Sequence, residues 1–122
     1  MQPFHDVRAQ YLAHRTEIDA AVRRVLESGS YLLGPELARF EAAFADWVGA
    51  RRAVGVGSGT AALELALRAA GVRAGDEVVV PALTAAPTVQ AVLRTGGVPC
   101  VVDVDDETLT LDPQAFARAW PA

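Results

Sequence analysis

The chain has 122 residues, 52% of them of hydrophobic type, and 11 basic against 15 acidic side chains give a formal net charge of −4. A chain this apolar can build a core, and an acidic chain without a basic stripe is a poor partner for the phosphate backbone of a nucleic acid. All 11 basic side chains are arginine. A reaction that needs a lysine amine therefore cannot take it from these residues.

The single cysteine and the absence of long apolar runs indicate where the protein works. Cys100 lies in the apolar run 98–102, where we expect a small buried thiol and no disulfide. No stretch approaches the roughly 20 apolar residues of a membrane span, and no charged-then-apolar leader follows Met1. We therefore expect a cytoplasmic protein with no membrane partner.

Residues 1–52 are expected to form a helical segment that packs on a larger domain. Apolar residues recur at intervals of three and four over 17–26, with Thr16 as a candidate N-cap and Gly29 as the end of the helix. A second amphipathic helix is predicted to start at Pro35 and to end at Gly49. These helices bring most of the bulky aromatic side chains, so their apolar stripes are expected to dock on something larger than each other.

From residue 53 onward, short β-type runs alternate with helical segments. The order is βαβαβ, and each strand is apolar on both faces, as in a parallel sheet covered by helices. A last helix is predicted to start at Asp112-Pro113. Three strands make a small sheet, so we expect residues 53–122 to be the truncated first part of a larger α/β domain, an incomplete three-layer parallel sheet. The expected strands are 53–56, 77–80 and 99–104, and the helices between them are 61–70 and 84–94.

The segment Gly55-Val56-Gly57-Ser58-Gly59-Thr60 leaves a predicted strand and opens a predicted helix. Glycines allow close approach of an anion, and the N–H groups and the dipole at a helix start favour a phosphate. Glycine and serine at such a turn can also serve its geometry alone, so the local sequence leaves both interpretations open. A P-loop is excluded because it needs a lysine, and the glycine spacing is wrong for a dinucleotide-binding turn.

The order and spacing of several motifs resemble the start of the DegT/DnrJ/EryC1/StrS family. Members are mostly sugar aminotransferases that use pyridoxal 5'-phosphate (PLP) and have the aspartate aminotransferase fold, fold type I. The resemblance implies that residues 53–122 belong to the PLP-binding large domain, and it covers only the N-terminal part of such an enzyme. The motifs are Ser28-Gly29-Ser30-Tyr31-Leu32-Leu33-Gly34-Pro35-Glu36, Phe40-Glu41-Ala42-Ala43-Phe44-Ala45, the 55–67 segment, Gly75-Asp76-Glu77-Val78-Val79-Val80-Pro81 and Val101-Val102-Asp103-Val104-Asp105.

The resemblance implies cofactor-binding roles at matching positions. Gly59 and Thr60 would bind the cofactor phosphate through backbone N–H groups and the threonine hydroxyl, while Ser58 would either donate as well or only cap the helix. Ala85 stands where many members place an aromatic side chain that stacks on the pyridine ring, so this chain departs from the pattern. Nearby, Thr84 and Thr88 have either a pocket role or a capping role.

The family's Schiff-base lysine and its aspartate partner for the pyridine nitrogen match no position in this chain, so we expect no catalytic residue here and no activity from the chain by itself. The resemblance implies an enzyme that aminates a nucleotide-linked keto sugar in amino-sugar biosynthesis, commonly with glutamate as donor, as a homodimer. Two alternatives stay open: a PLP-dependent sugar dehydratase of the same family, and a non-catalytic remnant chain.

The other polar candidates have simpler explanations. His5 and His14 stand apart from any cluster of ligands, so we expect no metal site. The acidic run 103–107 lacks the spacing of a calcium loop and is expected to be a solvated turn. Tyr31 resembles a family segment at the dimer contact near the active site, but a packing role is an equally good explanation.

Overall fold

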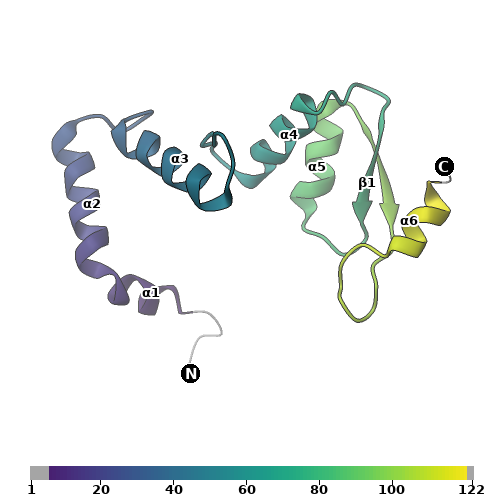
Figure 1. Ribbon diagram of the computed structural model, residues 1–122, viewed down its shortest axis with the longest axis horizontal. Coiled ribbons are helices and arrows are strands. Elements are labelled where there is room, and N and C mark those ends of the chain that lie inside the picture. Colours follow the sequence, from purple (N-terminus) through teal and green to yellow (C-terminus); the bar gives the residue numbers. More distant parts are fainter. Residues whose placement is uncertain (1–5, 121–122) are drawn as a thin grey trace. The chain divides into compact units, whose positions relative to one another are not determined.

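The computed structural model describes residues 6–120, and the chain divides into two compact units, Met1–Gly55 and Val56–Ala122. The first unit is helical, and the second combines helices with a parallel pair of strands (Figure 1). The division falls close to the predicted boundary between residues 52 and 53. The assignment of 1–52 and 53–122 as separate parts of a larger enzyme stays a prediction.

The first unit opens with a helix that the periodicity did not indicate. Helix α1 (Val7–Ala13) is capped by Asp6, whose carboxylate accepts the N–H groups of Arg8 and Ala9 at 3.0 and 3.1 Å. Helix α2 (Arg15–Ser28) begins before Thr16, so the prediction of Thr16 as its N-cap is wrong. The C-terminal end is as expected, because Gly29 ends α2 with a φ of 66°.

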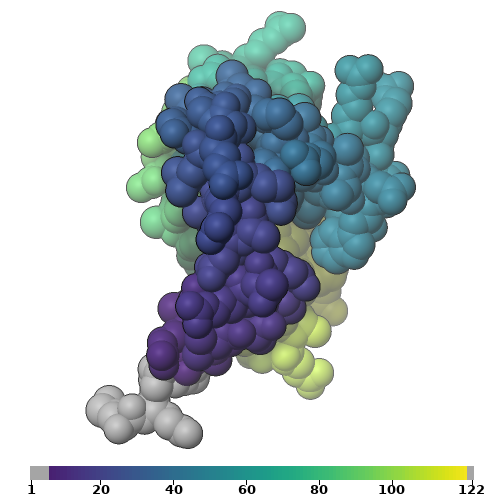
Figure 2. Space-filling model, turned by 90° about the vertical axis from the view of Figure 1, so that its left-hand side faces the viewer, coloured from purple at the N-terminus to yellow at the C-terminus, as the bar shows by residue number. Residues whose placement is uncertain are grey.

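Helix α3 (Pro35–Val48) confirms the prediction at both ends. Pro35 stands in the first turn, where its missing N–H costs no hydrogen bond, and Gly49 ends the helix with a φ of 69°. The outward stripe of α3 is aromatic: ring centroids of Phe40 and Phe44, and of Phe44 and Trp47, lie 5.7 Å apart. Trp47 is 80% exposed. In the space-filling view of Figure 2, the helices of the first unit are coloured purple to blue.

The second unit is a small α/β arrangement in which β1 and β2 pair in parallel, with Glu77 opposite Val98 and Pro81 opposite Val102. Helix α5 is the crossover between the strands and contacts both of them, whereas α6 contacts β2 (Figure 1). The elements are α4 (Gly59–Ala69), β1 (Glu77–Pro81), α5 (Ala86–Thr95), β2 (Val98–Val102) and α6 (Pro113–Ala119).

Two of the predicted strand assignments need correction. Residues 53–56 have no regular secondary structure, so the part of the sheet formed by residues 6–120 has two strands where three were expected. A strand exists only through ladder hydrogen bonds to a neighbour, and this segment pairs with neither described strand. The last strand ends at Val102, and Val104 forms an antiparallel bridge with Leu111 instead.

The core of the second unit consists of small side chains. Val80, Ala91 and Val92 are almost completely buried between α5 and the strands. The one buried polar side chain among the described residues is Thr95, whose hydroxyl donates to the carbonyl of Val92 at 2.7 Å and accepts the N–H of Gly97 at 3.3 Å. Many larger apolar side chains stay exposed, as expected for part of a larger domain.

A closed loop joins β2 to α6. The N–H of Asp105 donates to the carbonyl of Thr110 at 2.9 Å, and the N–H of Asp112 donates to that of Asp103 at 3.0 Å. The Asp105 carboxylate accepts the N–H groups of Glu107 and Thr108 and the Thr108 hydroxyl, which holds the pKa of Asp105 below its usual value. The acidic run is therefore a hydrogen-bonded turn. Asp112 caps α6 as predicted, accepting the N–H of Gln114 at 2.8 Å.

Candidate cofactor site

The N-terminus of α4 presents two backbone donors. Ser58 is extended and caps the helix: its hydroxyl oxygen accepts the N–H of Ala61 at 3.2 Å, and its carbonyl accepts the N–H of Ala62 at 3.0 Å. The N–H groups of Gly59 and Thr60 make no hydrogen bond to any other described residue. Two aligned donors at the positive end of an 11-residue helix therefore face outward.

The space in front of these donors suits a phosphate. A side-chain Cβ built at Gly57 or at Gly59 would meet no atom within 4 Å, so the turn is open. The first turn of α4 carries no acidic side chain that would repel a dianion. Thr60 is half-buried, and its hydroxyl has no hydrogen-bond partner in the part of the chain that the structure describes. The residues present thus fit a phosphate monoester such as that of PLP.

The start of α5 provides the second predicted position. Ala85 occupies the N-cap of α5 and is exposed, with no side-chain cap. The hydroxyls of Thr84 and Thr88 lie 2.8 Å apart and are hydrogen-bonded to each other. Neither hydroxyl caps the N-terminus of α5, which has no side-chain cap. The methyl group of Ala85 offers no aromatic face, as the sequence implied.

Helices α4 and α5 bring these two positions to the same end of the second unit. The helices pack side by side, and Arg68 near the C-terminal end of α4 donates to the carbonyl of Arg94 near the C-terminal end of α5 at 2.7 Å (Figure 1). Parallel neighbours joined at their C-terminal ends have their N-termini on the same side. Since α5 directly follows β1, that side is the carboxyl end of the strand, where α/β folds commonly bind ligands.

The remaining candidates form no second site. The hydroxyl of Tyr31 donates to the carbonyl of Leu26 at 3.4 Å, and the side chain is 64% exposed, so its dimer-contact role and its packing role both stay predictions. Cys100 is half-buried. The pKa of its thiol is raised, mainly by burial and to a lesser extent by the neighbouring Glu77 carboxylate. Among residues 6–120 no group of three His, Cys, Asp or Glu side chains could hold a metal ion, and His5 lies outside the described residues. None of the helices described is long and apolar enough to cross a bilayer.

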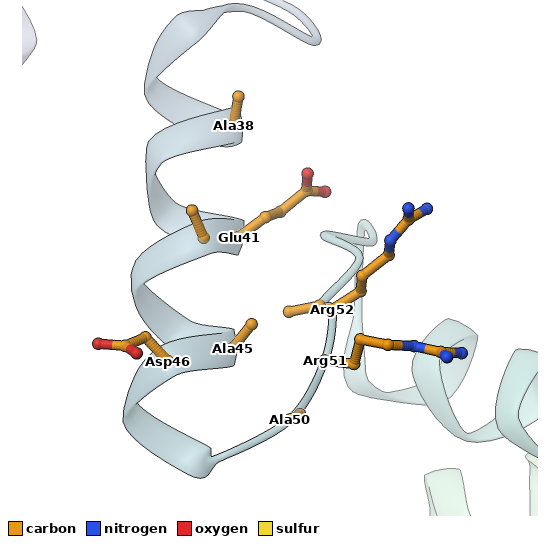
Figure 3. Close-up of a pocket in the computed structure, with 9 residues that line it drawn as sticks. Ala38, Glu41, Ala45, Asp46, Ala50, Arg51 and Arg52 are labelled. Carbon is orange, nitrogen blue, oxygen red and sulfur yellow. The ribbon is translucent and has the colours of Figure 1, made fainter.

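Sequence reasoning assigned no role to Glu41. In the structure, its Oε1 accepts the backbone N–H of Gly55 at 2.7 Å. Glu41 lines an open depression of about 510 Å³ in the first unit, between α3 and residues 50–53 (Figure 3). One signal was present in the sequence: Leu37, Glu41 and Ala45 are four residues apart and share one helix face, so a carboxylate interrupts an otherwise apolar stripe.

Comparisons with known proteins agree with the resemblance in the sequence. The model of the DegT/DnrJ/EryC1/StrS aminotransferase family matches residues 13–120. The chain is 50% identical over 117 residues to dTDP-3-amino-3,4,6-trideoxy-alpha-D-glucose transaminase of Streptomyces venezuelae, covering 96% of this chain and 31% of that protein. It is 40% identical over 119 residues to UDP-2-acetamido-2-deoxy-3-oxo-D-glucuronate aminotransferase of Pseudomonas aeruginosa, covering 98% of this chain and 33% of that protein.

Solved structures agree in fold. The crystal structure of S. venezuelae DesV in complex with a ketimine intermediate has a TM-score of 0.92 and 49% identity, with 97% of this chain and 32% of that chain covered. NtdA from Bacillus subtilis with bound cofactor PMP has a TM-score of 0.83 and 34% identity, with 88% of this chain and 25% of that chain covered.

The fold is therefore part of the α/β architecture of the fold type I, PLP-dependent aminotransferases, with a small parallel sheet. The chain spans about a third of the length of the curated relatives it matches. It belongs to the DegT/DnrJ/EryC1/StrS aminotransferase family.

Proposed function

We propose that the protein carrying this chain is a PLP-dependent aminotransferase that acts on a nucleotide-linked keto sugar in amino-sugar biosynthesis, and that the N-terminus of α4 holds the cofactor phosphate. The observation that carries the phosphate site is the pair of unpaired N–H groups at Gly59 and Thr60 in an open turn. The substrate class rests on relatives whose names specify dTDP- and UDP-linked sugars.

In this proposal the residues of the chain bind and orient the cofactor. The N–H groups of Gly59 and Thr60 and the Thr60 hydroxyl donate to the phosphate oxygens, and the hydroxyl of Ser58 keeps its proton free to donate while its oxygen caps α4. Ala85 leaves the ring without a stacking partner at that position. PLP itself supplies the electron sink that amino-group transfer needs. The amine that bonds to the cofactor is not among these 122 residues, which contain no lysine.

We further propose that the enzyme takes its amino group from a donor such as glutamate, forms a homodimer and is located in the cytoplasm. The exposed apolar side chains on α2 and α3 favour the presence of another protein surface that covers them, either a second copy or the rest of the enzyme. These side chains include Val22, Leu26, Phe40, Phe44 and Trp47. The lone thiol of Cys100 agrees with a reducing compartment.

The deciding experiment titrates the intact enzyme with PLP and with inorganic phosphate, comparing the unmodified protein with Thr60→Val and with the control Thr16→Val. Thr16 is an exposed helical threonine of α2 whose hydroxyl has no hydrogen-bond partner among the described residues. Thr60→Val removes the hydroxyl with little change in side-chain shape and should weaken PLP binding about tenfold, as expected for the loss of one hydrogen bond to a charged group. Thr16→Val should leave it unchanged.

The same preparation tests the reaction. Incubation with a dTDP- or UDP-linked keto sugar and glutamate should yield the aminated sugar. Equal PLP affinity in Thr60→Val and the unmodified protein would remove Thr60 from the site. A dehydrated sugar in place of an aminated one would instead assign the dehydratase activity found in the same family, and no conversion would leave a non-catalytic protein.

A further inference from the structure

The carboxylate of Glu41 is bound to the backbone at the last residue of the first unit. Its Oε1 accepts the N–H of Gly55 at 2.7 Å in a partly buried contact between residues 14 positions apart. The bond is therefore tertiary and joins α3 to the segment that leads to α4. A charged acceptor makes such a bond shorter and stronger than a bond between two neutral groups.

This bond is the main polar restraint on the segment that it holds. Among residues 6–120, the backbone of residues 51–57 makes no other hydrogen bond. The next restrained residue is Ser58, whose carbonyl accepts the N–H of Ala62. Among the described residues, the Glu41 carboxylate is thus the acceptor that satisfies the N–H of Gly55.

The surroundings of Glu41 favour this single use of its charge. It makes no ion pair within 4.0 Å in the part of the chain described, whereas Glu36 on the same helix pairs with Arg24 and Arg39. Leu37, one turn before Glu41, lies so close that a Cβ at Gly55 would come within 2.5 Å of its Cδ1. Figure 3 shows the Glu41 side chain projecting from α3 into the depression. Gly55 is thus held by a hydrogen bond and flanked by an apolar side chain.

We infer that Glu41 is a positioning residue for the cofactor phosphate: by holding Gly55, it fixes the path on which the chain enters the turn that carries Gly59 and Thr60. The inference rests on the function proposed above, because it concerns how well that turn binds phosphate. Glu41 acts through the backbone, so its loss should affect the phosphate contact selectively.

The test uses the intact enzyme, freed of cofactor and titrated with PLP and with pyridoxal, which lacks the phosphate. Glu41→Ala removes the acceptor, and Glu41→Gln keeps a carbonyl oxygen in the same place. Asp46→Ala is the matched control, since Asp46 lies on α3, lines the same depression and makes no side-chain hydrogen bond to a described residue. Glu41→Ala should weaken PLP binding about tenfold and pyridoxal binding by less than about twofold, Glu41→Gln should recover most of the loss, and Asp46→Ala should change neither.

Equal losses for PLP and pyridoxal in Glu41→Ala would reduce Glu41 to a structural role and overturn the inference, as would unchanged PLP affinity. If Thr60→Val weakens PLP binding and Glu41→Ala does not, the positioning role alone fails. If neither variant weakens it, the proposed phosphate site fails. Should Glu41→Ala not fold, Glu41→Asp carries the same comparison, because it keeps the charge but shortens the side chain and breaks the 2.7 Å contact.

Discussion

Arg68 donates from its guanidinium group to the carbonyl oxygen of Arg94 at 2.7 Å and to the carboxylate of Glu64 at 3.0 Å. The carbonyl belongs to the last turn of α5, where backbone oxygens lack a partner within the helix, so one arginine closes the end of a neighbouring helix. This contact fixes α4 against α5 at the end opposite the candidate site.

Replacing Arg68 by alanine should therefore destabilise the second unit. Half of the side chain is exposed, so solvent screening limits the effect to about 1 kcal/mol in the free energy of unfolding. Denaturant unfolding measures the loss. Arg73→Ala is the control, since Arg73 is exposed and its side chain makes no ion pair or hydrogen bond to a described residue. Equal stability of the two variants would contradict a structural role for the Arg68–Arg94 contact.

Substitutions at Ser58 separate capping from phosphate binding. Ser58→Ala removes the acceptor of the Ala61 N–H and should cost about 1 kcal/mol of helix stability, seen as faster hydrogen exchange of the Ala61 amide. Ser58→Asp keeps an oxygen at the cap and should preserve stability. Its negative charge at the phosphate position should nevertheless weaken PLP binding about tenfold or more. An unchanged PLP affinity in Ser58→Asp would place the phosphate elsewhere.

Position 85 allows a gain of binding to be tested. Ala85 is exposed at the start of α5, so a larger side chain there displaces no core residue. Ala85→Phe should restore the aromatic face that the resemblance implies and tighten PLP binding about threefold to tenfold, as expected for one aromatic stacking contact. Fluorescence titration of the intact enzyme measures the change, with Ala85→Leu as a control for bulk alone. The same gain in both variants would argue against stacking.

The closed loop should make stability depend on pH at the acid end. Three donors on the Asp105 carboxylate lower its pKa in the folded state below the 3.8 of an unperturbed aspartate. The stabilisation is therefore present above that value and is lost as the pH falls through the lower folded pKa. Thermal unfolding between about pH 5 and pH 3 should show a smaller acid-induced drop for Asp105→Asn than for the unmodified protein. Parallel curves for the two proteins would exclude Asp105 as a contributor.

Features set by neighbouring residues could be predicted from the sequence. The helix ends at Gly29 and Gly49, the start of α3 at Pro35 and the cap of α6 at Asp112 each depend on interactions within a few residues. The Ser58 cap and the open turn at Gly59 belong to the same class. For this reason, the position of a candidate phosphate site was recognisable before any fold was known.

Features that depend on distant contacts were missed or wrong. The run 53–56 has the composition of a strand, but a strand also needs a partner edge, and the sequence does not say which edge is present. The contact between Glu41 and Gly55 links residues 14 apart, so the local pattern marks Glu41 as a carboxylate in an apolar stripe but does not reveal its partner. Helix α1 was missed for a different reason: its Asp6 cap is a local feature, but the helix buries no residue and so carries no core-facing stripe.

The closed loop between β2 and α6 also matters for protein engineering. Hydrogen bonds between Asp103 and Asp112 and between Asp105 and Thr110 pin its two ends together, while its tip at Asp106 and Glu107 is exposed. Extra residues inserted at the tip would displace the contacts of Asp105 with Glu107 and Thr108, but they would lie within a loop whose ends are already joined, so the added length costs little conformational entropy. A peptide tag or a fluorescent label could therefore be placed between Asp106 and Glu107 while β2 and α6 keep their present contact.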